Sequence, residues 1–367
     1  MTTASAYAAT SPTSGLSAST IDRREPEADD VEIAIDYCGL CHSDVHAVRG
    51  EWGGTDYPLV PGHEIVGRVS QVGEHVSVFQ EGDLVGVGCM VDSCRVCDSC
   101  QDGQEQYCEQ GLIPTYGGTD RRHDGVTTQG GYSSHIVVDQ GYVLRVPENL
   151  DPAAVAPLLC AGVTTYSPLR YYGVKHGDSV GVVGLGGLGH MAVKIAKAMG
   201  AIVTVFTTSS SKSQAAHELG ADNVVLSTDV QAMGDMVHSL NFIVDTVAAQ
   251  HDLNPFLATL KRDGGLVQLG LPSGEMPPVD PRILIRRRLS YLGSNIGGIA
   301  ETQEMLDFCA EYGVVSDIEM VKADQLDEAY DRMVAGDVRY RFVLDNSSLP
   351  EAGHGAARGD APAGRKA

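Results

Sequence analysis

The chain has 367 residues, of which 43% are hydrophobic and 20% are charged, so it is long enough for two domains with sizeable cores. Its formal net charge of −22 predicts repulsion from nucleic acids and anionic membranes, and we expect neither as a partner. No long apolar run or secretory signal is present, which predicts a cytoplasmic protein; in that reducing compartment, nine cysteines favour metal binding or catalysis over disulfides.

The first half of the chain has the pattern of a mainly antiparallel β region. Residues 1–20 are rich in Ala, Ser and Thr and locally predict a flexible tail. Residues 31–37 alternate apolar and polar side chains like a half-buried strand, which we expect to end at Cys38 and Gly39. Between residues 61 and 150, frequent glycines separate short valine-rich runs, which predicts further strands.

The pattern changes near Asp151, where Asp151-Pro152 is typical of a helix start. From there strand-like and helix-like segments alternate, which predicts parallel βαβ units and an α/β fold. The expected strands are residues 179–183, 202–206, 223–226, 242–247 and 266–269, and the expected helices are residues 189–199 and 213–219. A helix from Glu301 and a strand at 339–344 follow, and residues 346–367 predict a disordered tail.

Four cysteines follow one another with the spacing C-x2-C-x2-C-x7-C: Cys94, Cys97, Cys100 and Cys108. Four thiolates so close in sequence can surround one tetrahedral Zn²⁺ and leave no open position for a substrate. The spacing therefore predicts a structural zinc site. An iron–sulfur cluster and a chance group of free thiols are the alternatives.

Gly184, Gly186 and Gly189 fit the pattern G-x-G-x-x-G between a predicted strand and a predicted helix. Glycines in this context let the backbone approach a pyrophosphate, and the helix N-terminus adds a positive potential. The second half of the chain therefore predicts a Rossmann domain with a doubly wound parallel sheet. A purely structural glycine turn is the alternative.

The segment after the second predicted strand favours NADP(H) over NAD(H). A carboxylate about 20 residues after the glycines would hold the ribose 2′-hydroxyl of NAD, but the first acidic residue after Gly184 is Glu218. The segment offers hydroxyls and an ammonium instead, which suit a 2′-phosphate: Thr207, Thr208, Ser209 and Lys212. A solvated serine-rich turn is the alternative.

A second group of metal-ligand residue types lies between Cys41 and Glu64. A catalytic zinc has three protein ligands and one exchangeable position. Cys41 and His63 could supply two ligands, and Cys160, at the predicted junction between the two regions, could supply the third or could be a buried apolar thiol. The cysteines that match no motif are expected in the core: Cys38, Cys89 and Cys309.

Five motifs occur in the order found in zinc-dependent medium-chain alcohol dehydrogenases: residues 41–46, residues 62–67, the four cysteines, residues 159–166 and the glycine motif. The chain resembles this family over about residues 20–345, and in particular its cinnamyl-alcohol-dehydrogenase-like branch, which includes NADP-dependent aldehyde reductases.

The resemblance implies a domain organisation. It implies a mainly β, GroES-like catalytic domain at residues 1–151 with both zinc sites, an NADP-binding Rossmann domain at 152–297 and a return to the catalytic domain at 298–345. It also implies an ordered strand near residues 5–10, in place of a flexible tail, and a homodimer built through the nucleotide domain.

The resemblance also implies roles for single residues at the catalytic zinc. Cys41, His63 and Cys160 look like its ligands, and Glu64 resembles a carboxylate that can enter the fourth position. Asp44 looks like the group that orients His63.

Ser43 and His46 look like the relay that passes a proton between the substrate oxygen and solvent. In addition to the segment from Thr207 to Lys212, the residues that look like cofactor contacts are His42, Thr164, Gly184, Gly186, Gly187, Leu188, Gly189, Thr246, Gly270, Leu292, Gly293 and Ser294.

The implied function is the reversible reduction of aldehydes to primary alcohols with NADPH, at a zinc ion that polarises the carbonyl. Two alternatives stay open: an NAD-dependent polyol or secondary-alcohol dehydrogenase of the same fold, and a non-catalytic protein that binds zinc and a nucleotide. The complete set of ligands and relay residues argues against the second, because a structural role requires neither Ser43 nor His46.

Overall fold

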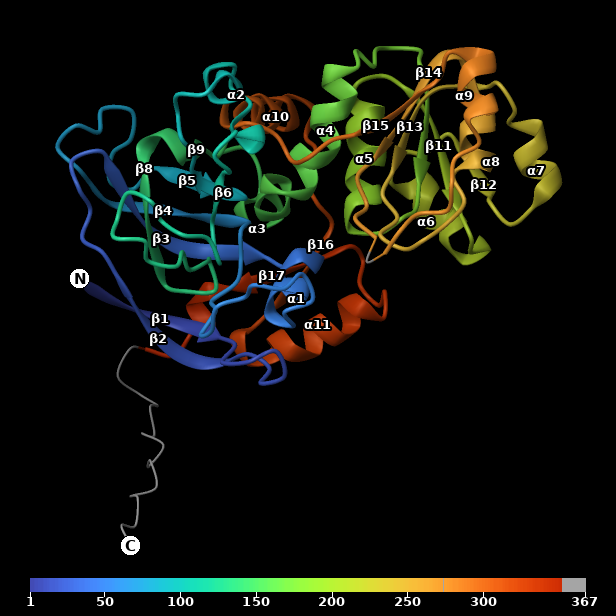
Figure 1. Ribbon diagram of the computed structural model, residues 1–367. Helices are drawn as coiled ribbons and strands as arrows, with labels where there is room; N and C mark the ends of the chain where they lie inside the picture. The colour runs from blue at the N-terminus through green and yellow to red at the C-terminus, as the bar shows by residue number, and fades with distance from the viewer. Residues whose placement is uncertain (273, 352–367) are drawn as a thin grey trace, which may run out of the picture.

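The computed structural model describes residues 1–272 and 274–351 of the chain. Figure 1 shows two halves side by side, with the N-terminal strands in one half and the strands of the middle of the sequence in the other. Within the described ranges, no helix combines the length and the apolar character needed to cross a bilayer.

Among the described residues, six strands form a wholly parallel sheet in the order β12-β11-β10-β13-β14-β15. The strands are β10 (Ser179–Val183), β11 (Ile202–Thr207), β12 (Asn223–Leu226), β13 (Leu240–Asp245), β14 (Leu260–Gln268) and β15 (Ser290–Gly293). Numbered along the chain, this is the 3-2-1-4-5-6 order of a dinucleotide-binding sheet, so the predicted Rossmann fold is confirmed. The order reverses between β10 and β13, and ligands of such sheets bind at the carboxyl ends of the strands at this point.

Helices connect and cover these strands (Figure 1). They are α4 (Ala161–Tyr171), α5 (Gly187–Ala198), α6 (Ser213–Glu218), α7 (Val230–Asp235), α8 (Asn254–Thr259) and α9 (Pro281–Arg287). α5 is buried on most of its sides, including Met191, Val193 and Ile195, because it packs against α4 as well as β10 and β11. The helix thereby presents its N-terminus at the glycine motif.

A second sheet contains seven of the described strands in the order β16-β17-β3-β4-β5-β9, and β8 also pairs with β3, along residues 30–34. The strands are β3 (Asp30–Gly39), β4 (Ile65–Val72), β5 (Leu84–Val87), β8 (His135–Asp139), β9 (Leu144–Arg145), β16 (Ile318–Val321) and β17 (Arg341–Asp345). The pairs of β3 with β4, β8 and β17 are antiparallel, which confirms the predicted antiparallel region. Because β16 and β17 join this sheet, the chain returns to its first half after the Rossmann sheet; the domain boundaries at residues 151 and 297 remain predictions.

Strand β3 is longer than the sequence pattern predicts. Cys38 and Gly39 were expected to end it, but Cys38 pairs with Ile65 and Leu344, and Gly39 pairs with Val343. Both residues continue the strand because partners on β4 and β17, far away in the sequence, take up their backbone groups.

The remaining elements are further α-helices, 3-10 helices and a small β ladder. They are α1 (His42–Val48), β6 (Met90–Asp92), α2 (Asp98–Gln101), η1 (Glu105–Tyr107), β7 (Ile113–Pro114), η2 (Gln140–Tyr142), α3 (Pro152–Val155), η3 (Ala156–Leu159), η4 (Ser210–Lys212), α10 (Ile299–Tyr312), η5 (Ala323–Gln325), α11 (Leu326–Val334) and η6 (Asn346–Ser348).

The two ends of the described chain correct the local sequence prediction. The expected flexible tail at residues 1–20 is wrong: β1 (Thr2–Ala8) and β2 (Ser17–Arg23) form an antiparallel hairpin, as the family resemblance implied more closely. Alternate alanines of β1 are fully buried, because small side chains let the hairpin pack closely on its neighbours. At the other end, buried Asn346 donates to the carbonyls of Gly131 and Ser133, so residues 346–351 are ordered; residues 352–367 of the expected tail lie outside the described residues.

One hydrophobic core joins the two halves. It contains Val182 and Val205 of the parallel sheet together with Leu144 of the antiparallel sheet and Leu159 of η3. The chain crosses from one half to the other through α3, η3 and α4 in this core. Cys160, between η3 and α4, is therefore held rigidly at the junction.

Candidate functional site

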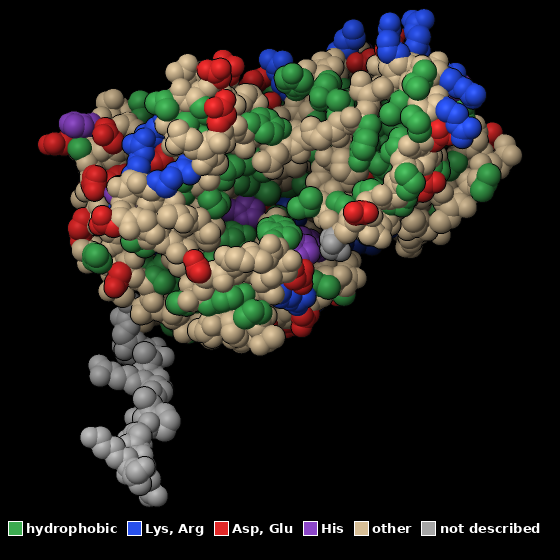
Figure 2. Space-filling model, in the orientation of Figure 1, with side chains coloured by type: hydrophobic (Ala, Val, Ile, Leu, Met, Phe, Trp, Pro, Cys, Tyr) green, Lys and Arg blue, Asp and Glu red, His purple; other side chains and the backbone are tan. Residues whose placement is uncertain are grey.

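Four potential metal ligands, remote in sequence, meet at the junction. Cys41, His63, Glu64 and Cys160 each offer one ligand atom, and these atoms all lie within 4.8 Å of one another. Cys41 caps α1, His63 and Glu64 precede β4, and Cys160 precedes α4. Figure 2 shows histidine side chains at the bottom of a hollow between the two halves. The structure thus brings together all four residues that the sequence nominated for the catalytic metal.

Asp44 holds two of these residues in place. Its buried carboxylate accepts hydrogen bonds from Nδ1 of His63 at 3.0 Å and from the backbone N–H of Cys41 at 2.8 Å. With the His63 proton on Nδ1, the lone pair of Nε2 is free to bind a metal. This is the orienting contact that the family resemblance implied for Asp44.

Glu64 is fully buried and forms an ion pair with Arg341 of β17, with 2.5 Å between Oε1 and Nη2. Burial raises the pKa of the Glu64 carboxyl to about 8, against the opposing effect of the Arg341 charge. Within residues 1–272 and 274–351, Oε2 of Glu64 has no hydrogen-bond partner. A buried oxygen of this kind requires a partner, and a cation among the neighbouring ligand atoms would provide one.

Two thiols and an imidazole make this group fit zinc. Cys2His is a known ligand set of catalytic zinc. A hydrogen bond from Cys160, together with the charges of His63 and Arg341, holds the pKa of the Cys41 thiol well below its usual range. Cys41 is therefore prepared to bind as a thiolate, the form that zinc takes.

Two residues at this site were missed or misplaced by the sequence analysis. Arg341 lies in the strand predicted at 339–344, but no local pattern gave it a role at the site. Cys89 was expected in the core, as Cys38 and Cys309 are, but it is partly exposed between β5 and β6. Its thiol lies beside Cys160 and His63.

The predicted proton relay lies on α1. Ser43 Oγ is 3.7 Å from the Cys41 sulfur, and His46 stands one helical turn further along, where its Nδ1 pairs with Glu51. In the described part of the chain, no direct hydrogen bond joins Ser43 to His46. The ring of Trp52 lies 5.2 Å from that of His46 and is 54% exposed, so it borders the relay from the solvent side.

The other four cysteines also meet in space. The sulfurs of Cys94, Cys97, Cys100 and Cys108 all lie within 4.8 Å of one another. Backbone N–H groups point at two of them, from Cys94 to the Cys108 sulfur and from Cys97 to the Cys94 sulfur, both at 3.3 Å. Such N–H contacts stabilise thiolates, so the residues present fit a structural zinc with four sulfur ligands.

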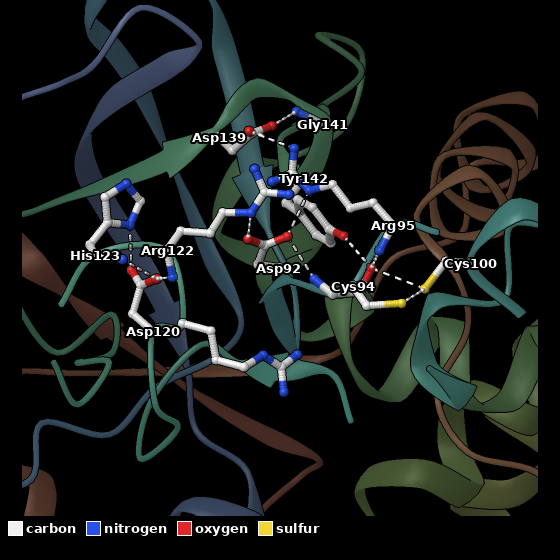
Figure 3. A network of polar contacts seen from close by, with 12 residues as sticks. Asp92, Cys94, Arg95, Cys100, Asp120, Arg122, His123, Asp139, Gly141 and Tyr142 are labelled. Atoms are coloured by element: carbon white, nitrogen blue, oxygen red, sulfur yellow. Dashed lines mark hydrogen bonds and ion pairs between the residues drawn. The ribbon is translucent and has the colours of Figure 1, made fainter. Parts of the chain in front are cut away.

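Two hydroxyls in a row reach this cysteine group from η2. Ser93 Oγ lies 3.2 Å from the Cys100 sulfur and 2.7 Å from the hydroxyl of Tyr142, and it accepts the backbone N–H of Arg95. A thiolate can only accept, so Ser93 must donate to Cys100 when a metal is bound, and Tyr142 must then donate to Ser93. Figure 3 shows Tyr142 and Cys100 on either side of this contact.

Arg95 fastens the same loop to the sheet. Its guanidinium contacts Asp92 and Asp139, each at 2.7 Å, and lies 5.1 Å above the ring of Tyr142 (Figure 3). Arg95 reaches them because its backbone adopts the left-handed conformation, with φ 63°. Arg122 pairs with the other oxygen of Asp92 at 2.7 Å. The cysteine loop is therefore anchored from both sides.

The glycine motif leaves room for a ligand at the carboxyl end of β10. A Cβ on Gly189 would lie 2.3 Å from the carbonyl oxygen of Gly184, so helix and strand approach too closely for another residue. A Cβ on Gly186 would meet nothing within 4 Å, which leaves its backbone open to a phosphate. The further predicted cofactor residues follow the ends of the neighbouring strands: Thr246 after β13, Gly270 after β14, and Leu292, Gly293 and Ser294 in or after β15.

The segment predicted to bind a 2′-phosphate lies beside this motif. Lys212 Nζ is 3.4 Å from the carbonyl oxygen of Leu185, inside the motif, and Thr208 is exposed. Thr207 is buried, and its hydroxyl accepts the N–H of Ser209 at 3.2 Å. The ammonium and the outer hydroxyls can therefore reach a phosphate, whereas the Thr207 hydroxyl serves the turn itself. Of the other two predicted contacts, His42 is exposed on α1 and Thr164 is buried on α4.

Comparisons with known proteins agree with this geometry. A family described as the alcohol dehydrogenase GroES-like domain matches residues 27–148, and one described as zinc-binding dehydrogenase matches residues 187–311. The chain is 55% identical to aldehyde reductase YahK of Escherichia coli over 349 residues, which are 94% of this chain and 98% of the relative.

Two solved structures extend the comparison. Cinnamyl alcohol dehydrogenase SbCAD4 of Sorghum bicolor has a TM-score of 0.92 and 45% identity, over 96% of this chain and 100% of that one. The cinnamyl alcohol dehydrogenase (CAD) of Helicobacter pylori complexed with NADP(H) has a TM-score of 0.88 and 41% identity, over 94% and 98%. The chain belongs to the zinc-binding alcohol dehydrogenases with a GroES-like and a Rossmann domain. Within them it falls in the cinnamyl-alcohol-dehydrogenase-like branch.

Proposed function

We propose that the chain is a zinc- and NADP(H)-dependent alcohol dehydrogenase that reversibly reduces aldehydes to primary alcohols. One observation carries this proposal: Arg341 touches both candidate sites. It pairs with Glu64 at 2.5 Å, and a Cβ on Gly187 of the glycine motif would lie 2.9 Å from its Cδ. The candidate metal ligands and the dinucleotide motif are thus separated by a single side chain. Hydride transfer requires the substrate and the cofactor to lie this close together.

The mechanism assigns roles to the residues of this chain. Cys41, His63 and Cys160 would hold zinc, which supplies a Lewis acid for the carbonyl oxygen when bound, while NADPH supplies the hydride. Ser43 donates a proton to the oxygen that becomes the alcohol, and His46 returns one from solvent. For alcohol oxidation, the proton moves in the opposite direction.

The cofactor is the point at which the proposal differs from an NAD-dependent polyol or secondary-alcohol dehydrogenase. The position of Lys212 beside the glycine motif supports NADP(H), as does the cofactor named for the H. pylori structure. Steady-state kinetics with NADPH and NADH on a panel of aliphatic and aromatic aldehydes test it. Lys212→Glu should raise the KM for NADPH at least about tenfold and the KM for NADH far less.

The exposed Lys175 provides the matched control, because it precedes the amino end of β10 whereas the glycine motif follows the carboxyl end. Lys175→Glu should leave both KM values unchanged, since it alters net charge equally without touching the predicted phosphate site. A preference of the unaltered enzyme for NADH, or equal effects of Lys212→Glu on both cofactors, would contradict the NADP(H) assignment.

We also propose a homodimer through the edge strand β15 and a cytoplasmic location. β15 pairs with β14 on one side and has no strand on its other side in the described part of the chain. Ile285 of α9 and Leu271 near this edge are 79% and 68% exposed, a typical feature of a surface that a partner covers. Light scattering should give twice the chain mass, and Ile285→Glu should lower the measured mass.

The cytoplasmic location is tested by fractionation of the native host, which should find the enzyme with cytoplasmic markers.

A further inference from the structure

A buried acid–base pair closes the loop between β13 and α8. Asp245, the last residue of β13, is fully buried, and its Oδ2 lies 2.9 Å from Nε2 of His251. Across residues 1–272 and 274–351, neither of these two atoms makes a regular hydrogen bond, so each depends on the other. Because buried polar atoms without a partner destabilise a fold, the protonation of the pair must make this contact attractive.

The contact made by the other ring nitrogen of His251 shows where one ring proton lies. Nδ1 lies 2.8 Å from the carbonyl oxygen of Ala249, and a carbonyl oxygen can only accept. Nδ1 therefore carries a proton. A neutral ring would then present the lone pair of Nε2 to the carboxylate of Asp245, and only a second proton removes this repulsion.

The second proton belongs on His251 rather than on Asp245. Free histidine has a pKa of about 6.5 and free aspartic acid about 3.9, and each charged form stabilises the other. Burial raises the pKa of the Asp245 carboxyl, whereas the charge of His251 and the N–H of Val247, which Oδ1 accepts at 3.1 Å, oppose this and favour the carboxylate. The side chains that face the pair from neighbouring elements are uncharged at neutral pH: Gln268 on β14, Tyr291 on β15 and Phe256 on α8.

The loop that this pair closes packs against the predicted cofactor site on two sides. Thr246 Oγ1 donates to the carbonyl of Val183 at 2.7 Å, and a Cβ on Gly184 would lie 3.0 Å from that hydroxyl. On the other side, a Cβ on Gly270 would lie 2.3 Å from the carbonyl carbon of Val247. The loop fills the space between the glycine motif and Gly270, so any shift of the loop moves the walls of the cofactor site.

We propose that His251 is a positioning residue: it is doubly protonated at neutral pH and, through its ion pair with Asp245, holds loop 246–253 in the shape that receives the dinucleotide. The positioning role rests on the proposed cofactor site. The charge state of His251 does not, and it can be measured on the free protein.

Ring ¹⁵N NMR shifts of the full chain, labelled with ¹⁵N-histidine, test the charge state. At pH 7 both ring nitrogens of His251 should carry protons, the signals being assigned by their loss in His251→Gln. In Asp245→Asn the side-chain amide can donate to Nε2, so the ring should become neutral, with its proton on Nδ1. A neutral His251 in the unaltered chain, in either tautomer, overturns the proposal.

NADPH binding tests the positioning role. His251→Gln should raise the Kd for NADPH, measured by nicotinamide fluorescence, about tenfold or more, whereas kcat at saturating NADPH should change much less. His217 provides the matched control, because its Nδ1 likewise lies 2.9 Å from a backbone carbonyl, that of Ala221, on the exposed side of α6. His217→Gln should leave the Kd unchanged, and circular dichroism should show that both variants are folded.

The two possible failures are distinguishable. An unchanged Kd in folded His251→Gln overturns the positioning role and leaves the proposed function intact. If the unaltered chain binds no NADPH, the proposed function fails together with the positioning role, whereas the NMR result on the charge of His251 stands on its own.

Discussion

Arg341 and Glu64 form a buried ion pair that joins the last strand of the catalytic sheet to the candidate metal site. Nη2 of Arg341 lies 2.5 Å from Oε1 of Glu64, and the same nitrogen donates to the carbonyl of Leu40 at 2.7 Å. Both side chains are almost inaccessible to solvent. Removal of either partner should therefore lower the free energy of unfolding.

At roughly pH 9, above the Glu64 pKa of about 8, Arg341→Met should destabilise the fold by about 3–5 kcal/mol, because it leaves the Glu64 carboxylate buried without a partner. The free energy of unfolding, measured with denaturant, checks this value. The double variant Arg341→Met/Glu64→Gln should recover most of the loss. A double variant as unstable as the single one would show that packing, rather than charge, makes Arg341 important.

Asp44→Asn should lower zinc affinity at the catalytic site about 10- to 100-fold, because His63 and Cys41 lose the carboxylate that orients them. After dialysis against a mild chelator, metal analysis should fall from about two zinc ions per chain to about one. Asp29→Asn is the matched control, since Asp29 likewise pairs with Nδ1 of a histidine, His75, at 3.4 Å, and both side chains are exposed. Retention of both ions in Asp44→Asn would contradict the assigned role.

Ser93→Ala should speed the release of the structural zinc about tenfold, because Cys100 loses the hydroxyl that donates to it. Transfer of zinc to a chromogenic chelator measures this rate without reference to enzyme activity. Tyr142→Phe should have a smaller effect in the same direction, since it removes only the donor to Ser93. Tyr166→Phe, whose hydroxyl bonds to Glu304 at 2.9 Å instead, should release zinc like the unaltered chain.

His190 should make the fold sensitive to mild acid. Burial, with the nearby charges of Arg341 and Lys194, lowers the pKa of His190 to about 3. The free ring has a pKa of about 6.5, so the unfolded chain binds the extra proton between these values. The contribution of His190 is therefore complete above about pH 6.5 and falls by roughly 1.4 kcal/mol per pH unit as the pH decreases towards 3.

Free energies of unfolding between pH 5 and pH 7 check the effect of His190. His190→Phe, which can keep the stacking on Tyr340, should show a shallower pH slope than the unaltered chain. Any loss of metal at low pH affects both proteins equally and cancels in the comparison. His75→Gln, at an exposed histidine, should keep the original slope; an equal slope in His190→Phe would refute the assignment.

The sequence predicted best those features that depend on neighbours along the chain. Strands 179–183 and 223–226 have the predicted bounds, since buried parallel strands are short apolar runs between turn residues. The two metal groups came from cysteine and histidine spacing, with the family resemblance adding Glu64, and the structure brings both together. The strand before the glycine motif and the helix after it were predicted correctly, because the glycines that form the turn between them are a local signal.

What the sequence analysis missed depends on contacts between distant segments. Arg341 lies 277 positions from Glu64, and no local pattern connects them. The β1–β2 hairpin looked like a tail because its alanines indicate packing only once their neighbours are known. Cys89 and His251 likewise acquire a role only from the groups that face them, Cys160 in one case and Asp245 in the other.

The pairing of β17 with β3 affects how the protein is assembled during synthesis. The parallel sheet is contiguous, from Ser179 to Gly293, and can form as soon as that segment leaves the ribosome. The antiparallel sheet begins earlier in the sequence but cannot be completed until Val343 reaches Gly39. The ligands Cys41, His63 and Cys160 are thus all synthesised well before Arg341, so a nascent chain can capture metal while Glu64 still lacks its partner, and the last strand then closes the site.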